Sequence, residues 1–155
     1  LFDVVPYIVS MAKGIGGGFP MGAFAARDEV AALFGPGDHG STFGGNALAS
    51  VVGRAVIETL VGEHVGEHVI ATGAHLTQAL ATLPHVSEVR GRGLMRAAQF
   101  DTPIATELVE QGLSAGLVLN HIGDSILRFL PPLVVTDEQV DAMASRLRGL
   151  IEGLA

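Results

Sequence analysis

The spacing of hydrophobic positions predicts two short strands at the start of the chain. Residues 7–11 form an almost unbroken apolar run, which predicts a short buried strand, and residues 23–26 predict a second strand. The segment between them is rich in glycine, which predicts a loop there.

Helical spacing follows these strands. A short helix is predicted over residues 28–34, with Asp28 as its N-cap. Two longer helices are predicted over about 46–60 and about 65–83. Pro84 ends the last of these, because proline cannot continue a helix.

The second half alternates between strand-like and helical patterns. Strands are predicted over residues 86–90, 94–100, 117–121 and 126–129, and helices over about 103–115 and 137–152. Thr136 is a good N-cap for the last helix, and Gln139 completes a capping box. The patterns therefore divide the chain into an α/β part, residues 1–85, and a small α+β part, residues 86–155.

Composition excludes several classes of protein. The chain has 155 residues, and its 48% hydrophobic content suits a buried α/β core. The net charge of −7 and the absence of a basic stripe argue against nucleic-acid binding. Cysteine is absent, which excludes disulfides and thiolate metal sites. The uncharged stretch 14–26 is too short and too rich in glycine to span a membrane. Because the chain begins at Leu1 rather than Met, we interpret it as a fragment.

Lys13 is the first candidate for chemistry. It lies between the apolar run and a cluster of glycines at 14–18. Burial lowers the pKa of an amine and makes it nucleophilic towards carbonyl groups, and glycines let a bulky ligand approach the main chain. A Schiff-base lysine beneath a flat phosphorylated cofactor needs both features. The alternative is that Lys13 reaches solvent from the end of a strand.

Ser41 and Thr42 precede the predicted helix that begins near Asn46. Hydroxyl groups and free backbone amides before a helix N-terminus form a natural anion site, so this segment is a candidate for phosphate binding. The alternative is that one of the two hydroxyls is simply the N-cap of the helix.

Arg128 lies inside an apolar strand pattern. An arginine in such a strand is costly unless it is paired, and its planar guanidinium suits a carboxylate. The carboxylate of a ligand and that of a structural Asp or Glu would each satisfy it, and both interpretations stay open.

Two further motifs carry weaker signals. His64, Glu67 and His68 match the inverted zinc-protease pattern H-x-x-E-H. Nearby glycines weaken the helix that such a site needs, so we expect both histidines on a solvated face and no metal. Residues 90–93 form a tight basic turn, for which we expect a structural role.

Four segments together resemble the class III pyridoxal-phosphate aminotransferases. Residues 10–23 are similar to the segment of the cofactor lysine, and residues 37–46 to the phosphate segment. Residues 89–95 and 127–133 are similar to two C-terminal signatures. The four occur in family order and spacing, and the run 16–20 most resembles the acetylornithine aminotransferase branch.

The resemblance implies an architecture. The chain would be α/β, the C-terminal part of a fold-type I PLP-dependent transferase. Residues 1–85 would be the C-terminal part of the PLP-binding large domain, and residues 86–155 the small C-terminal α+β domain. Family members are homodimers with the active site at the interface, so a cytoplasmic homodimer is expected.

The resemblance also implies roles. Lys13 would bind pyridoxal 5'-phosphate covalently and carry a proton between substrate and cofactor. Thr42 would bind the cofactor phosphate of the partner subunit, and Ser41 would lie near the substrate. Arg128 would pair with a glutamate or a substrate carboxylate.

The expected reaction transfers an amino group from N-acetylornithine to 2-oxoglutarate, in arginine biosynthesis. Its products are N-acetylglutamate semialdehyde and glutamate. Ornithine, succinyldiaminopimelate and 4-aminobutyrate aminotransferases share most of this machinery and stay open as alternatives.

The resemblance also shows what this chain lacks. In the family, an upstream half supplies a Gly-Thr phosphate turn, an aromatic that stacks on the cofactor ring, an Asp for the ring nitrogen and an Arg for the substrate. We therefore expect little or no transaminase activity from this chain alone. Two other classes stay open: a non-catalytic binding or interaction protein, and a zinc hydrolase that uses His64, Glu67 and His68.

Overall fold

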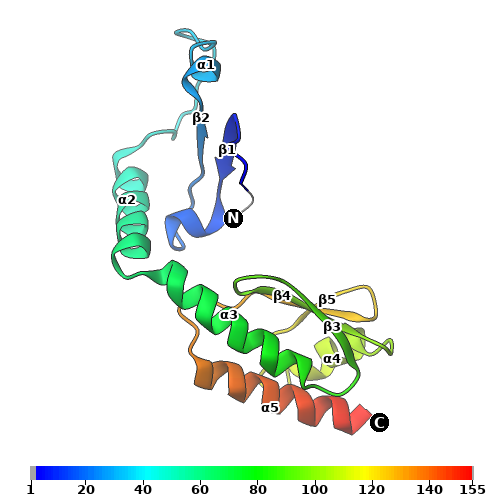
Figure 1. The fold of residues 1–155 in the computed structure, drawn as a ribbon. Coiled ribbons are helices and arrows are strands. Elements are labelled where there is room, and N and C mark those ends of the chain that lie inside the picture. Colours follow the sequence, from blue (N-terminus) through cyan, green and yellow to red (C-terminus); the bar gives the residue numbers. More distant parts are fainter. Residues whose placement is uncertain (1–2, 155) are drawn as a thin grey trace. The chain divides into compact units, whose positions relative to one another are not determined.

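The computed structural model describes residues 3–154, which form two compact units divided between Glu63 and His64 (Figure 1). The first unit contains β1 (Ile8–Met11), the 3-10 helix η1 (Lys13–Gly16), β2 (Ala23–Ala26), α1 (Asp28–Ala31) and α2 (Ala47–Gly62). The second contains α3 (Val65–Ala81), β3 (Val86–Arg92), β4 (Met95–Phe100), α4 (Ala105–Gly112), β5 (Asn120–Ile122), β6 (Ile126–Phe129) and α5 (Asp137–Leu154).

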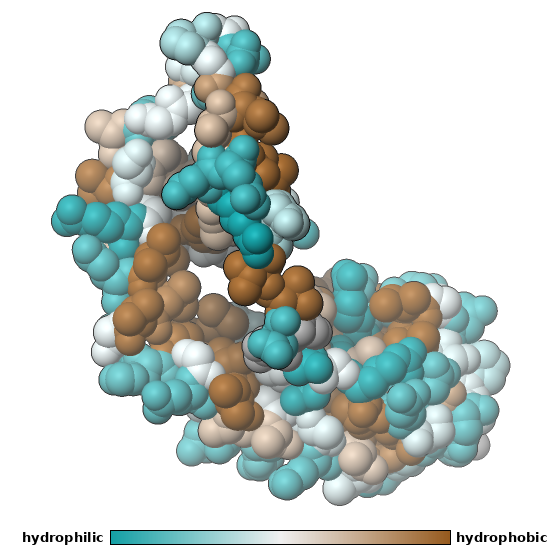
Figure 2. Space-filling model, turned by 45° about the horizontal axis from the view of Figure 1, so that its top comes forward, coloured by the Kyte–Doolittle hydropathy of each residue, from teal (hydrophilic) through white to brown (hydrophobic). Residues whose placement is uncertain are grey.

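The first unit is built on an antiparallel ribbon. β1 and β2 pair from Ile8 opposite Ala26 to Met11 opposite Ala23, so both predicted strands are confirmed. The predicted burial of β1 is wrong, because all four of its residues are exposed, with Ile8 at 57%. A ribbon of two strands offers no second layer to cover its faces. Hydrophobic side chains are accordingly visible on the surface (Figure 2).

The short helix of the first unit differs from the sequence expectation in its N-cap and its length. α1 covers only Asp28–Ala31, and Asp28 is its first residue rather than its N-cap. Its chain continues to Phe34 as turns, with single bonds back to Val30 and Ala31. α2 begins at Ala47 as expected.

The second unit is a four-stranded antiparallel sheet with helices packed on it. The strand order is β3-β4-β6-β5. α3 packs against β3 and β4, and α5 lies beside α3 (Figure 1). The predicted strands at 86–90, 94–100 and 126–129 and the last helix are all confirmed within about two residues. The strand predicted over 117–121 is shorter and begins later, at Asn120.

The core of the second unit joins these layers. Its largest fully buried side chains come from α3, α4, β6 and α5: Leu76, Leu80, Leu108, Leu127, Leu147 and Ile151. Each of these helices turns one apolar stripe inward, which is what their helical spacing predicts. α3 groups with this unit, while the predicted domain boundary near residue 85 stays a prediction for the parent protein.

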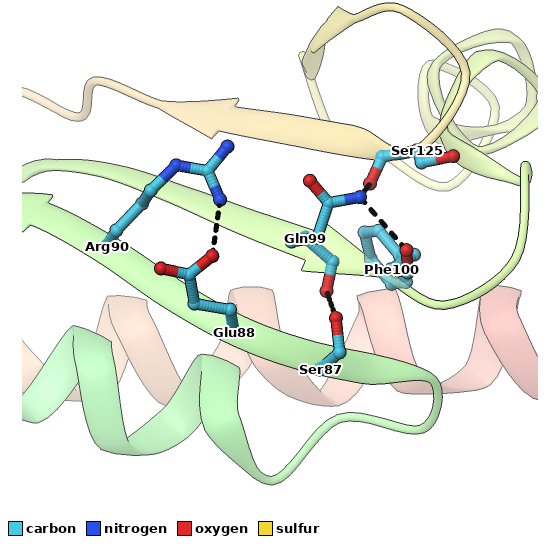
Figure 3. A network of polar contacts seen from close by, with 6 residues as sticks. All are labelled: Ser87, Glu88, Arg90, Gln99, Phe100 and Ser125. Atoms are coloured by element: carbon cyan, nitrogen blue, oxygen red, sulfur yellow. Dashed lines mark hydrogen bonds and ion pairs between the residues drawn. The ribbon is translucent and has the colours of Figure 1, made fainter.

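Polar contacts stabilise the sheet where β3 begins and β4 ends (Figure 3). The Gln99 side-chain amide donates to the carbonyl oxygens of Phe100 at 3.0 Å and Ser125 at 3.1 Å. The Ser87 hydroxyl donates to the Gln99 carbonyl at 3.2 Å. Gln99 thus links β3, β4 and the turn before β6.

Candidate functional site

Lys13 lies at the first position of η1, two residues after the end of β1. Its backbone has φ of +55°, a conformation that side-chain-bearing residues seldom adopt and that often marks a functional site. The expected burial of Lys13 is wrong for this chain, since the residue is exposed. Within residues 3–154 its amine has no hydrogen-bond or ion-pair partner. It is also the only lysine in the sequence, a signal that strengthens its candidacy and that motif reading missed.

The glycine segment after Lys13 leaves open space beside the main chain. A Cβ added at Gly14 or at Gly18 would meet no atom within 4 Å. Gly17 and Gly18 have φ of +55° and +105°, which only glycine adopts readily. The backbone is therefore accessible to a bulky ligand at Gly14 and Gly18, whereas Gly16 is buried and Gly17 lies close to Val56 of α2.

The segment with Ser41 and Thr42 meets the end of the glycine segment. A pocket of about 450 Å³ is lined by Pro20, Met21, Gly22, Ala23, Ser41, Phe43, Gly44, Gly45, Asn46, Ala49 and Ser50. Ser41 faces this pocket, whereas Thr42 is exposed and does not line it. The structure thus brings together two segments that lie about twenty residues apart in sequence.

The N-cap of α2 is Asn46, so the interpretation of Ser41 or Thr42 as the cap is wrong. The Ala49 amide donates to Asn46 Oδ1 at 2.9 Å, and the Asn46 side-chain amide donates to the Phe43 carbonyl at 2.8 Å. Asparagine is itself a strong N-cap residue, and its position just before the apolar spacing is the signal that identifies it. The hydroxyls of Ser41 and Thr42 are therefore not used to cap α2.

Arg128 projects from β6 in the second unit. It stands opposite Ala97 of β4 and Asn120 of β5, and it is exposed. Within the described residues its guanidinium makes no ion pair with an Asp or Glu, so the structural-pair interpretation finds no support. Arg128 lines a pocket of about 640 Å³.

The surroundings of Arg128 are mainly apolar. The other residues lining its pocket are Leu76, Leu117, Val118, Leu119, Asn120, Phe129, Leu130, Pro131, Pro132, Val135, Gln139, Val140 and Met143. A free guanidinium beside such walls is suited to a carboxylate whose charge is poorly solvated there.

The zinc interpretation is contradicted. Among residues 3–154 no group of three His, Cys, Asp or Glu side chains could hold a metal ion. His64 Nδ1 lies 3.3 Å from Glu67 Oε1, but His68 Nε2 lies 2.9 Å from the Val135 carbonyl oxygen instead. His64 has φ of +52° and stands before the helix, so the motif does not share one helical face.

The basic turn expected over 90–93 is shorter and begins later, because Arg90, Gly91 and Arg92 belong to β3. Arg90 bonds Glu88 at 2.9 Å along the same strand (Figure 3). Gly91 has φ of +126°, and a Cβ there would lie 2.1 Å from the Met95 carbonyl oxygen. Gly93 and Leu94 form the turn that closes the β3–β4 hairpin, next to the pair of Arg92 and Met95. Separately, no helix in the described part of the chain is both long and apolar enough to cross a membrane.

Comparison with known proteins gives consistent matches. The acetylornithine aminotransferase of Caldanaerobacter subterraneus is 44% identical over 144 residues, 90% of this chain and 36% of that protein. The structure of N-acetylornithine aminotransferase from Stenotrophomonas maltophilia superposes with a TM-score of 0.83 at 34% identity, over 98% of this chain and 41% of that one. The ornithine aminotransferase of Toxoplasma gondii, crystallised with oxidized glutathione and partially occupied by PLP, gives 0.86 at 30% identity, over 97% and 37%.

This chain spans about two fifths of the length of these relatives. Its α/β architecture corresponds to the C-terminal part of a fold-type I PLP-dependent transferase. The sequence model of the family described as aminotransferase class-III matches residues 1–151. With nearly its whole length matched, the chain belongs to the class III aminotransferase family.

Proposed function

We propose that the parent protein of this chain is a PLP-dependent aminotransferase acting on N-acetylornithine and 2-oxoglutarate in arginine biosynthesis. The observation that carries the proposal is Lys13, the sole lysine, which is exposed at the start of a 3-10 turn in a chain matching the family over residues 1–151. The acetylornithine aminotransferases at 44% identity support acetylornithine as the amino donor. The products would be N-acetylglutamate semialdehyde and glutamate.

The residues present suit pyridoxal 5'-phosphate. Lys13 offers an amine with no competing partner among residues 3–154, and the main chain beside it is open at Gly14 and Gly18. When bound, the cofactor supplies an electron sink for the substrate carbon. The Lys13 amine would hold the cofactor and then move the proton from the substrate carbon. Ser41, on the pocket wall, would lie near the substrate.

Arg128 would orient a carboxylate of the substrate. Its guanidinium is exposed and unpaired within the described residues, and a planar fork binds a carboxylate through two parallel bonds.

A cytoplasmic homodimer with the active site at its interface is part of the proposal. Thr42 would bind the phosphate of the cofactor held by the partner subunit. Its exposed hydroxyl, outside the pocket that Ser41 lines, is available for such a role. Exposed apolar side chains on the adjacent helix α2, such as Leu48 at 61% and Val51 at 64%, suit an interface.

The test uses the full-length parent protein. Lys13→Ala should abolish transamination and the visible cofactor band, and Lys13→Arg should do the same while keeping the charge. Initial rates with acetylornithine, ornithine, succinyldiaminopimelate and 4-aminobutyrate would identify the amino donor. An active Lys13→Ala variant would refute the proposal, and a preference for another donor would replace only the substrate.

The chain of 155 residues by itself should have little or no transaminase activity. A non-catalytic binding or interaction protein is the alternative from another class. A stable, monodisperse 155-residue species that gains no cofactor absorbance, from a gene encoding nothing upstream, would favour that alternative.

A further inference from the structure

Met21 is wedged between two glycines that come from different elements of the first unit. A Cβ added at Gly16, in η1, would lie 2.8 Å from Met21 Cγ. A Cβ added at Gly53, in α2, would lie 2.7 Å from Met21 Cε and 3.0 Å from its Sδ. Because such separations are shorter than side-chain contacts allow, Met21 can occupy this position only while both neighbours are glycine.

The contact of Met21 with Gly16 and Gly53 involves two of the few buried residues of the first unit. In residues 3–63 only Gly16, Ala49 and Gly53 are buried. Gly16 and Gly53 touch Met21, and Ala49 lines the same pocket as Met21, one helical turn before Gly53. η1, in the segment that joins β1 to β2, lies beside α2 (Figure 1), and Met21 is the side chain that lies against both Gly16 of η1 and Gly53 of α2.

A second glycine contact fixes the same segment. A Cβ at Gly17 would lie 2.9 Å from Val56 Cγ2, on the next turn of α2. Gly17 ends η1 with φ of +55°, and its amide donates to the Gly14 carbonyl at 3.1 Å. η1 thus approaches α2 more closely than a chain with side chains at 16 and 17 would allow.

η1 begins at Lys13, so the position of η1 against α2 determines where the Lys13 backbone lies. The segment is fixed at its ends by the ribbon, where Met11 stands opposite Ala23. Between those ends, the contacts with α2 are what hold the turn. Lys13 itself has a positive φ, a conformation that persists only where neighbouring structure imposes it.

We propose that Met21 is a positioning residue: seated between Gly16 and Gly53, it holds η1 against α2 and thereby sets the Lys13 backbone for reaction with the cofactor. The inference rests on the proposed function in one respect, that Lys13 is the residue that binds the cofactor. Met21 lines the pocket shared with Ser41 but needs no contact with the cofactor to act in this way.

The experiment measures how fast Lys13 reacts in the full-length parent protein. Apoprotein is mixed with pyridoxal phosphate, quenched with borohydride at intervals, and the reduced adduct on the Lys13 peptide is quantified by mass spectrometry. Within residues 1–155 no other lysine competes for the label. Met21→Ala should slow adduct formation by roughly 10- to 100-fold, the usual consequence of misplacing a reacting group by about 1 Å.

Gly53→Ala separates positioning from folding. Alanine favours the helix by roughly 1 kcal/mol over glycine, yet its Cβ would push Met21 from its seat. We expect slower adduct formation with the thermal midpoint unchanged or raised. Gly62→Ala is the matched control, since it makes the same change in α2 where no atom lies within 4 Å. It should react at the wild-type rate.

Rescue tests the size requirement. Met21→Leu keeps most of the volume and should restore most of the rate lost in Met21→Ala. Wild-type rates in both Met21→Ala and Gly53→Ala would overturn the positioning role and leave the proposed function intact. If the wild-type protein forms no adduct on Lys13, the proposed function fails and this inference fails with it.

Discussion

At the scale of single residues, Lys13 combines an exposed amine with a backbone that resists a side chain. Its φ of +55° places it in the left-handed region, which costs a residue with a Cβ about 1–2 kcal/mol. A glycine at this position would avoid that cost, but it could not carry an amine. At this position the proposed chemistry therefore requires lysine, whereas stability favours glycine.

Lys13→Gly should accordingly raise the free energy of unfolding of the full-length parent by about 1 kcal/mol relative to Lys13→Ala. Both variants lack the amine and should form no borohydride-trapped adduct, so only the strain distinguishes them. Urea unfolding of the two apoproteins checks this. Equal stabilities would mean that Lys13 is unstrained in the complete protein.

Arg128, unlike Lys13, is expected to have no effect on stability, because its guanidinium forms no ion pair within the described residues. Arg128→Gln should change the free energy of unfolding by less than about 0.5 kcal/mol. In the complete enzyme Arg128→Gln should raise the KM for 2-oxoglutarate about 10- to 100-fold. This is the size of effect expected from the loss of a charge-assisted hydrogen bond to the substrate carboxylate.

Steady-state kinetics of the full-length parent measure this effect. Arg54→Gln is the control for loss of an arginine, since within residues 3–154 Arg54 forms only an exposed pair with Glu58 at 3.2 Å. An unchanged KM in Arg128→Gln would remove Arg128 from the substrate site.

At the scale of elements, α5 has the clearest local signal in the chain, and its predicted capping box is confirmed. The backbone amide of Gln139 donates to the Thr136 hydroxyl at 3.3 Å, and the backbone amide of Thr136 donates to Gln139 Oε1 at 3.0 Å. Thr136→Ala should cost about 1 kcal/mol of stability, because it leaves a helix-end amide unsatisfied. Thermal unfolding measures the loss. Ser145→Ala, which removes a hydroxyl from the exposed middle of α5, should cost nothing.

The same helix start carries a pH-dependent contribution. The Glu138 carboxylate accepts a hydrogen bond from its own backbone amide and one from Thr136, and these lower its pKa below the ordinary value of 4.5, with a further contribution from His75. Because the folded-state pKa is depressed, the stabilisation is present above the unfolded-state value and is lost as the pH falls through the folded-state pKa. Unfolding curves of wild type and Glu138→Gln should therefore differ at neutral pH and converge in acid. A difference that persists unchanged in acid would contradict this assignment.

The elements that sequence predicts well are those whose signals are local. The capping box, Pro84 after α3 and the apolar spacing of α5 all lie within a few residues of the structure they determine. The wedge of Met21 between Gly16 and Gly53 could not be read in this way, because its two glycines are 37 positions apart and nothing local links them. The predicted burial of β1 was wrong for a related reason. An apolar run indicates a strand that is suited to burial, but whether it is buried depends on other elements that pack on it.

At the scale of the whole molecule, burial is distributed unequally between the two units. The apolar core cluster, from Leu76 to Ile151, lies entirely in the second unit, whereas only Gly16, Ala49 and Gly53 are buried in residues 3–63. Burying apolar area is the main source of stability, so two glycines and an alanine contribute little. The second unit should therefore account for most of the stability of this chain.

Amide hydrogen exchange on the 155-residue chain checks that expectation. Amides of α3, β4, β6 and α5 should exchange slowly and together, as one cooperative unit, while those of β1, β2 and α1 exchange fast. Leu127→Ala removes a fully buried side chain and should cost about 2–5 kcal/mol, accelerating exchange throughout the second unit. Val118→Ala, at a residue 92% exposed, should change nothing. Slow exchange in β1 and β2 would show instead that the ribbon carrying Lys13 is stable in this chain alone, and the site's dependence on the rest of the parent protein would have to be reconsidered.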